Sequence, residues 1–126
     1  MSMSAISGYL YIAMTVLLTV YGQLVIKWQV DLAGAAPTAP VEKFLFLVRL
    51  MFTPWVFSGL AAAFLASVFW LATLTRFPLS YAYPFVAFTF VLVVGGGGLL
   101  FGETIRLPTT IGLVLIVAGI TVASQG

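Results

Sequence analysis

Residues 15–27 read Thr-Val-Leu-Leu-Thr-Val-Tyr-Gly-Gln-Leu-Val-Ile-Lys, with a polar side chain at every fourth position. These polar residues are Thr15, Thr19, Gln23 and Lys27, and Tyr11 extends the series towards the N-terminus. Four residues advance a helix by about 400°, so the five polar groups lie along one slowly drifting face of an otherwise apolar helix. A membrane helix with such a polar stripe should turn it towards protein or a water-filled cavity rather than towards lipid.

The composition places this helix in a membrane. Of the 126 residues, 63% are hydrophobic and 6% are charged, whereas soluble domains are about 25% charged. Five cations and three carboxylates are too few to cover a water-exposed surface. They also delimit four charge-free runs, three of 26 residues (1–26, 50–75 and 77–102) and one of 20 residues (107–126). Each run can hold a helix that crosses about 30 Å of hydrocarbon.

We therefore predict an all-α membrane protein with four transmembrane helices in a single domain, residues 1–126. The expected helices cover residues 9–29, 54–75, 80–101 and 108–123. Pro54 and Pro108 stand where proline is tolerated, in the first turn of a helix.

The longest connection joins the first two expected spans. Residues 33–40 are small residues and prolines, which do not form a regular helix. In the segment that begins at residue 42, Glu42, Lys43, Arg49 and Thr53 fall near one helical face, and aromatic and aliphatic side chains occupy the others. This pattern suits a short interfacial helix in the headgroup layer. The alternative is an early, tilted start of the second span.

The cations are unequally divided between the two sides of the predicted bundle. The first and third connections carry Lys27, Lys43, Arg49 and Arg106, against Arg76 alone on the other side. This bias favours cytoplasmic first and third connections and external termini. Dual or inverted insertion stays an alternative, because a weak bias is what an antiparallel dimer needs.

The sequence offers no enzyme site. Histidine and cysteine are absent, and Asp31, Glu42 and Glu103 are widely spaced, so we expect no catalytic residues, no metal site and no cofactor. Five scattered cations with a net charge of +2 make no nucleic-acid-binding patch. They favour contact with anionic membrane lipids instead.

Glycines mark two candidate packing sites. Gly95, Gly96, Gly97 and Gly98 lie inside the third span and lack the Lys-Ser/Thr pair of a phosphate loop. They permit either close helix packing or a bend. In the fourth span, Gly112 and Gly119 form a small-residue groove for a helix of the same subunit or of a partner. Since four helices enclose little space, a dimer is the expected working form.

Several motifs together point to a family. Gly22 is followed five residues later by Lys27, and residues 78–83 (Pro-Leu-Ser-Tyr-Ala-Tyr) open the third span. Residues 100–103 (Leu-Phe-Gly-Glu) close that span, and the fourth span carries its paired glycines. In this order and spacing, essentially the whole chain resembles the small multidrug resistance branch of the drug/metabolite transporter superfamily.

The chain departs from the drug exporters of that branch at their functional positions. The resemblance implies a proton-exchanging glutamate in the first helix, and the matching position, counted back from Gly22 and Lys27, is Thr19. The exporters' third-helix tryptophan aligns with Val86, and their Gly-x-Gly bend aligns with residues 88–90, Phe-Thr-Phe. Because a hydroxyl cannot exchange protons near neutral pH, we expect no antiport of cationic drugs.

Four segments match another branch better. They are residues 22–24 (Gly-Gln-Leu) followed by Lys27, 67–70 (Ser-Val-Phe-Trp), 81–84 (Tyr-Ala-Tyr-Pro) and 90–93 (Phe-Val-Leu-Val). They resemble the paired small subunits that flip undecaprenyl-phosphate-linked aminoarabinose across the bacterial inner membrane. The resemblance implies a multi-pass flippase for a polyprenyl-phosphate-linked sugar that works as a homodimer or heterodimer. It leaves the sugar open.

The polar stripe suits such a substrate, which has an anionic phosphate, a hydroxyl-rich head and a tail that stays in lipid. We expect Lys27 to hold the phosphate. Neutral partners for the sugar are Gln23, Thr19 and Thr15. A second polar cluster near the opposite membrane face is expected from Arg76, Ser80, Tyr81 and Tyr83.

Each of these roles has an alternative. Lys27 would serve as an interfacial anchor if its stem snorkels to water, and Tyr81 and Tyr83 would belong to an aromatic belt. Glu103 is expected to be a loop residue that pairs with Arg106.

Two other functions stay open. One is a small-molecule exporter of the small multidrug resistance type with a different coupling residue. The other is a non-transporting membrane assembly subunit, which would accompany a larger enzyme and show no activity alone.

Overall fold

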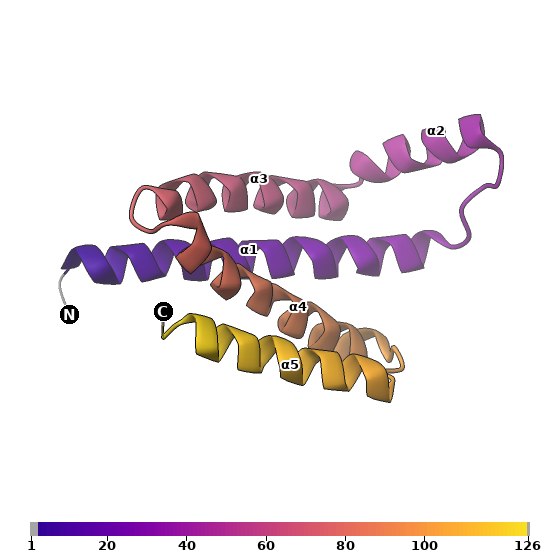
Figure 1. Ribbon diagram of the computed structural model, residues 1–126. Coiled ribbons are helices and arrows are strands. Elements are labelled where there is room, and N and C mark those ends of the chain that lie inside the picture. Colours follow the sequence, from indigo (N-terminus) through magenta and orange to yellow (C-terminus); the bar gives the residue numbers. More distant parts are fainter. Residues whose placement is uncertain (1–2, 126) are drawn as a thin grey trace.

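The computed structural model describes residues 3–125, and all regular structure in this range is helical (Figure 1). The helices are α1 (Met3–Ala33), α2 (Pro40–Met51), α3 (Pro54–Leu74), α4 (Leu79–Phe101) and α5 (Leu107–Ala123). By length and composition, α1, α3 and α4 are able to cross a membrane, and α5 is a shorter apolar helix. At about 1.5 Å per residue, α5 is about 25 Å long. The prediction of an all-α membrane protein is confirmed.

The helix ends lie close to the predicted ones, except at α1. The first helix extends beyond the predicted residues 9–29 and ends just before Gly34, whose φ of 82° turns the chain. Pro54 is the first residue of α3, and Pro108 is the second residue of α5. Proline fits there because first-turn N–H groups have no partner within the helix.

Helix α1 is the centre of the arrangement. Figure 1 shows α3 running antiparallel along one side of α1, and α4 crossing its other side obliquely. Helix α5 packs mainly against α4 and has no buried residue. The start of α1, the α3–α4 turn and the end of α5 lie at one end of the molecule (Figure 1).

Small residues form the contact between α1 and α3. Gly22 and Gly59 are buried where the two helices meet, and Ala62 and Ala66 continue this contact along α3. Small residues let helix backbones approach closely, which is how membrane helices gain van der Waals contact without a hydrophobic driving force.

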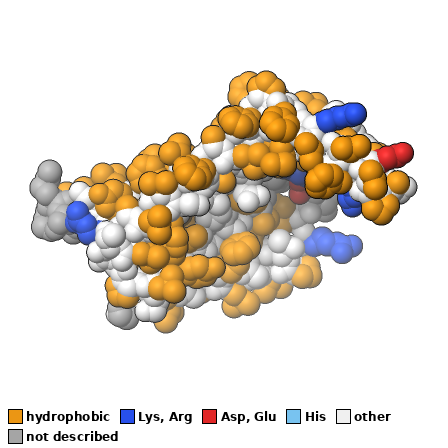
Figure 2. Space-filling view, turned by 90° about the horizontal axis from the view of Figure 1, so that it is seen from above, with side chains coloured by type: hydrophobic (Ala, Val, Ile, Leu, Met, Phe, Trp, Pro, Cys, Tyr) orange, Lys and Arg blue, Asp and Glu red, His pale blue; other side chains and the backbone are white. Residues whose placement is uncertain are grey.

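Charged side chains gather at the ends of the molecule, while hydrophobic side chains cover most of the face in Figure 2. The end formed by α2, the last turns of α1 and the α4–α5 connection carries Lys27, Lys43, Arg49 and Arg106. Arg76 lies at the other end, in the α3–α4 turn. The two groups of cations are therefore separated as the sequence predicts, and the inserted orientation stays a prediction.

Helix α2 is separate from α3, because Phe52 and Thr53 break the helical chain between them. Figure 1 shows α2 diverging from α1 beyond the start of α3. None of its residues is buried, and Phe44 is 64% exposed. The apolar side chains of α2 are thus free to contact lipid, and its place in the headgroup layer stays a prediction.

Candidate functional site

A groove runs between α1 and α4, and α3 forms part of one wall. It consists of three adjoining cavities of about 460, 420 and 240 Å³. Gln23 and Val93 line both the first and the second cavity. Thr19, Tyr83 and Val86 line both the second and the third. The three cavities therefore adjoin one another in a row, which we call the α1/α4 groove.

The polar stripe of α1 lines this groove along its length. Lys27 borders the first cavity and Thr15 the third, with Gln23 and Thr19 between them. Each step of four residues rotates the stripe by about 40°, so it drifts around α1. Thr15 accordingly shares its cavity with α3 residues, whereas Lys27 faces the end of α4 and the α4–α5 connection.

Both threonines of the stripe line the groove, and Thr19 is half-buried whereas Thr15 is buried. The Thr15 hydroxyl donates to the carbonyl of Tyr11 over 2.8 Å, and the Thr19 hydroxyl donates to the carbonyl of Thr15 over 2.7 Å. Both hydroxyl protons are thus engaged within the helix, and the oxygen lone pairs remain available. The Gln23 amide is able to donate and to accept. Together they suit a ligand rich in hydroxyl groups.

Lys27 carries the positive charge of the first cavity and shares it with Asp31. The Lys27 Nζ lies 3.0 Å from Asp31 Oδ1, and the two side chains are 48% and 47% exposed. Exposed ion pairs at this helical spacing contribute little to stability. A ligand phosphate is therefore able to replace the Asp31 carboxylate at little cost.

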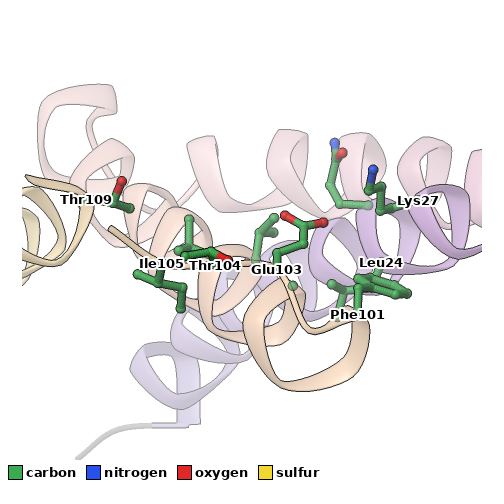
Figure 3. Close-up of a pocket in the computed structure, with 11 residues that line it drawn as sticks. Leu24, Lys27, Phe101, Glu103, Thr104, Ile105 and Thr109 are labelled. Carbon is green, nitrogen blue, oxygen red and sulfur yellow. The ribbon is translucent and has the colours of Figure 1, made fainter. Parts of the chain in front are cut away.

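Glu103 reaches the same cavity from the α4–α5 connection. Gly102 has a φ of 65° and turns the chain back over the last turn of α4, where the Glu103 N–H donates to the carbonyl of Gly97 over 3.4 Å. The Glu103 carboxylate lies over Gly97, and a Cβ added to Gly97 would be 3.5 Å from Glu103 Oε2. Figure 3 shows Glu103 and Lys27 among the residues around the cavity.

This position differs from the expected role of Glu103. Among the side chains of residues 6–125, no ion pair joins Glu103 to Arg106. The reason is the backward turn of the connection, which directs Glu103 towards α1 and leaves Arg106 as the N-cap residue of α5. Glu103 therefore belongs to the groove rather than to a local loop pair.

Thr89 is a polar residue of the middle cavity that the sequence analysis did not assign to a site. Its Oγ1 atom is buried and has no hydrogen-bond partner within the described part of the chain. Buried hydroxyls usually have a partner. Thr89 shares this cavity with Thr19 and Gln23, so an entering ligand would meet three neutral polar groups there.

Tyr83 and Tyr81 face different parts of the molecule. Tyr83 lines the groove, and its ring centroid lies 6.0 Å from that of Trp70 on α3. Tyr81 instead forms a 2.9 Å hydrogen bond between its hydroxyl and that of Tyr9 on α1. Two residues advance a helix by about 200°, so side chains at this spacing point in nearly opposite directions. The expected second cluster therefore does not include Tyr83.

Arg76 and Ser80, the other expected members, lie in the α3–α4 turn and the first turn of α4, at the same end of the molecule as Tyr81. The Arg76 guanidinium stands over the ring of Tyr11, with 6.0 Å between Cζ and the ring centroid. Ser80 is exposed in the first turn of α4. Phe77 packs against Tyr9 and Tyr81, with centroid distances of 5.2 and 5.5 Å. Tyr9, Phe77 and Tyr81 thus form an aromatic cluster at this end of the molecule, and Arg76 lies over the ring of Tyr11 at the same end.

The glycines of α4 have separate neighbours. The helix continues through all four. A Cβ at Gly96 would lie 3.0 Å from Leu24 of α1, and one at Gly98 would lie 2.7 Å from Ile105. The absence of a side chain at Gly97 leaves space for the Glu103 carboxylate, and a Cβ at Gly95 would face open space. In this structure the run therefore accommodates α1 and the α4–α5 connection.

The proposed dimer glycines, Gly112 and Gly119, face open space. No atom lies within 4 Å of a Cβ built at either position. Their packing role within this subunit is thus unfilled, and their role in a dimer stays a prediction.

A helical pattern in α4 would have revealed more of the groove. Tyr83, Val86, Phe90, Val93 and Gly97 follow one another at spacings of three or four residues, and all line the groove. Such spacing marks one face of a helix. Glu103 gave no such signal, because a turn rather than a helix places it.

Comparison with curated proteins gives a consistent set of relatives. The chain is 32% identical over 125 residues to a probable 4-amino-4-deoxy-L-arabinose-phosphoundecaprenol flippase subunit ArnF of Photorhabdus laumondii, covering 94% of this chain and 97% of the relative. It is 34% identical over 119 residues to a probable subunit ArnE of the same flippase in Yersinia pseudotuberculosis, covering 94% and 96%.

A probable ArnF subunit of Proteus mirabilis is 32% identical over 126 residues, covering 94% of this chain and 92% of the relative. No family model matches the chain, and no solved structure matches it. The similarity to these relatives spans nearly the whole length of both proteins.

Proposed function

Since this chain belongs to the family of 4-amino-4-deoxy-L-arabinose-phosphoundecaprenol flippase subunits, which are small multidrug resistance-like proteins, we propose that it is a subunit of a lipid-linked sugar flippase. The substrate is a sugar joined through phosphate to a polyprenyl (undecaprenyl) chain, and the membrane is the bacterial inner membrane. The α1/α4 groove is the path of the polar head.

The observation that carries this proposal is the chemistry of the groove. A single cation, Lys27, lies at one end, and neutral hydrogen-bonding groups continue from it through Gln23 and Thr19. A sugar phosphate has the complementary order, with one anionic group followed by hydroxyls. The contact between Lys27 and the phosphate should be the strongest interaction with the head, because both groups are charged.

The openness of the groove supports a lipid substrate. Tyr83 and Phe90 line it and are 62% and 63% exposed. A polyprenyl tail is therefore able to remain among membrane lipids while the head moves along the groove. This separation avoids the cost of placing a polar head in hydrocarbon.

We further propose that the working unit is a dimer. One subunit borders the groove on α1, α3 and α4, and its outer side is uncovered. A second subunit, either a copy of this chain or a similar small subunit, would enclose the head from that side. The exposed glycine face of α5 is the proposed contact.

Reconstitution tests this function. The purified chain, alone and with a co-expressed small subunit, is placed in liposomes that contain a fluorescent polyprenyl-phosphate-linked sugar, and headgroup accessibility is followed with a membrane-impermeant reagent. We expect faster exchange of headgroups between leaflets than in protein-free liposomes. Unchanged exchange with lipid binding intact would indicate an assembly subunit. Proton movement driven by soluble compounds would indicate an exporter.

A further inference from the structure

The first cavity of the groove is lined by one cation and one carboxylate, and a second carboxylate adjoins the cation from outside the lining. Its charged lining residues are Lys27 and Glu103, and Lys27 is already paired with Asp31 at 3.0 Å. Two carboxylates therefore stand near one ammonium group. An anionic phosphate that binds to Lys27 displaces Asp31 but still meets the charge of Glu103.

The fold holds Glu103 in this position through several independent features. Gly102 adopts the left-handed conformation that reverses the chain. Gly97 has no side chain, which leaves space for the carboxylate. Ile105, two residues later, occupies the corresponding space beside Gly98, where a Cβ would lie 2.7 Å from its Cδ1. The connection is thus fitted against α4, and Glu103 is directed into the cavity.

We propose that Glu103 is a specificity-determining residue that binds a cationic amine on the sugar head while Lys27 holds the phosphate. This inference rests on the proposed flippase function and adds a residue that selects the charge of the sugar. A head with both an anionic phosphate and an ammonium group balances the cavity, because each charge meets a group of opposite sign. Thr104 and Thr109 line the same cavity and supply neutral hydrogen-bonding groups for the sugar.

The experiment compares lipids that differ in one charge. Native mass spectrometry of the purified full chain measures binding of a polyprenyl-phosphate-linked amino sugar, its N-acetyl derivative and the bare polyprenyl phosphate. We expect the wild-type chain to bind the amino sugar about 10-fold more tightly than its N-acetyl derivative, since a charge-assisted hydrogen bond is lost on acetylation. Glu103→Gln should abolish this preference, and it should tighten rather than weaken binding of the N-acetyl lipid, because the phosphate then no longer meets the Glu103 charge.

Two variants control for folding and for general charge effects. Glu103→Asp keeps the carboxylate and should therefore retain part of the preference for the amino sugar. If the role of Glu103 were only structural, keeping the carboxylate would not retain this preference. Glu42→Gln removes a carboxylate from α2, outside the groove, and should keep the full preference. A preference for the amino sugar that persists in Glu103→Gln would overturn the inference and leave the flippase function standing.

A phosphate and an ammonium group also occur together in phosphatidylethanolamine, so this phospholipid is the competing source of the same chemistry. An excess of it should not displace the amino-sugar lipid, because its head lacks the hydroxyls that the neutral groups contact. Effective displacement would overturn the assignment to a sugar head. Failure of the wild-type chain to bind any of the three polyprenyl lipids would overturn the proposed function itself, and with it this inference.

Discussion

The backbones of Gly22 on α1 and Gly59 on α3 are in direct contact. A Cβ added to Gly22 would lie 2.9 Å from the carbonyl oxygen of Gly59, and one added to Gly59 would lie 3.2 Å from that of Gly22. With Gly22 against α3, Thr19 and Gln23 point about 60° and 100° away around α1. The glycine contact therefore sets the rotation of α1 that turns its polar stripe towards the groove.

Gly22→Ala should separate the two helices and destabilise the protein. The added methyl group meets a backbone atom, which cannot rotate away as a side chain does, and overpacking of this kind costs about 1–3 kcal/mol. Unfolding in lipid bilayers by steric trapping measures the change. Gly95→Ala is the matched control because its Cβ faces open space. Equal stability of the two variants would contradict the close contact.

Lys27→Ala should weaken binding of polyprenyl phosphate about 10- to 150-fold, because a charge-assisted contact is lost. Lys27→Arg should retain part of the affinity, since the charge survives with a different geometry. Gln23→Ala should have a smaller effect, as it removes a neutral hydrogen bond. Native mass spectrometry or a fluorescent lipid reports each affinity.

Asp31→Asn should act in the opposite direction to Lys27→Ala. The Lys27–Asp31 pair competes with a ligand phosphate, so removing the Asp31 charge should tighten phosphate binding about 2- to 5-fold.

The prediction for Lys27 has its own contradicting outcome. If the Lys27→Ala variant binds and flips lipid like the parent chain, then Lys27 is an interfacial anchor and the stripe needs another explanation.

Expression of the chain should give no resistance to quaternary ammonium compounds. Thr19 occupies the position of the exporters' proton-exchanging glutamate, and it shares the groove with Val86, which replaces their tryptophan. Adding such compounds to detergent-solubilised protein should release no protons. Thr19→Glu should add a titratable group without creating an exporter, because Val86 and Phe88 still differ. Clear proton release from the unmodified chain near neutral pH would refute the flippase assignment.

Gly112→Leu or Gly119→Leu should weaken association between subunits. Both glycines face open space in the subunit, so leucine disturbs no internal contact and only prevents close approach of another helix. Single-molecule dissociation in bilayers or cross-linking measures the effect. Val114→Leu, an exposed position on α5, is the control for added bulk. Unchanged association in both glycine variants would leave the dimer interface elsewhere.

Thr89→Val should leave stability unchanged or raise it, yet weaken binding of the lipid-linked sugar about 2- to 10-fold. Valine has a similar shape and removes a buried hydroxyl that has no partner, while the ligand loses one neutral hydrogen bond. Thr110→Val on α5, outside the groove, is the control. Binding equal to that of the parent chain would place the sugar away from the middle cavity.

Helical spacing accounts for much of the site. Thr15, Thr19, Gln23 and Lys27 line the groove because residues four apart share a helical face, whatever the helix packs against. The same arithmetic separates Tyr81 from Tyr83, which the predicted second cluster places together. The limits of α3, α4 and α5 were predictable because charges are rare in the middle of membrane helices and because Pro54 and Pro108 lie in first turns, although α4 also contains Pro84.

The sequence by itself determined most of the elements: apolar runs between charges define α3, α4 and α5, and a four-residue period defines the polar face of α1. Only the tertiary structure decided the partners of those elements. The contact of Gly22 with Gly59 depends on two helices meeting, and the place of Glu103 depends on a left-handed turn at Gly102 and free space over Gly97. Local spacing fixes which side chains share a face, because helix geometry repeats along the chain. Contacts between segments far apart in the chain depend on how the helices pack together, and the spacing of residues within one helix does not specify this packing.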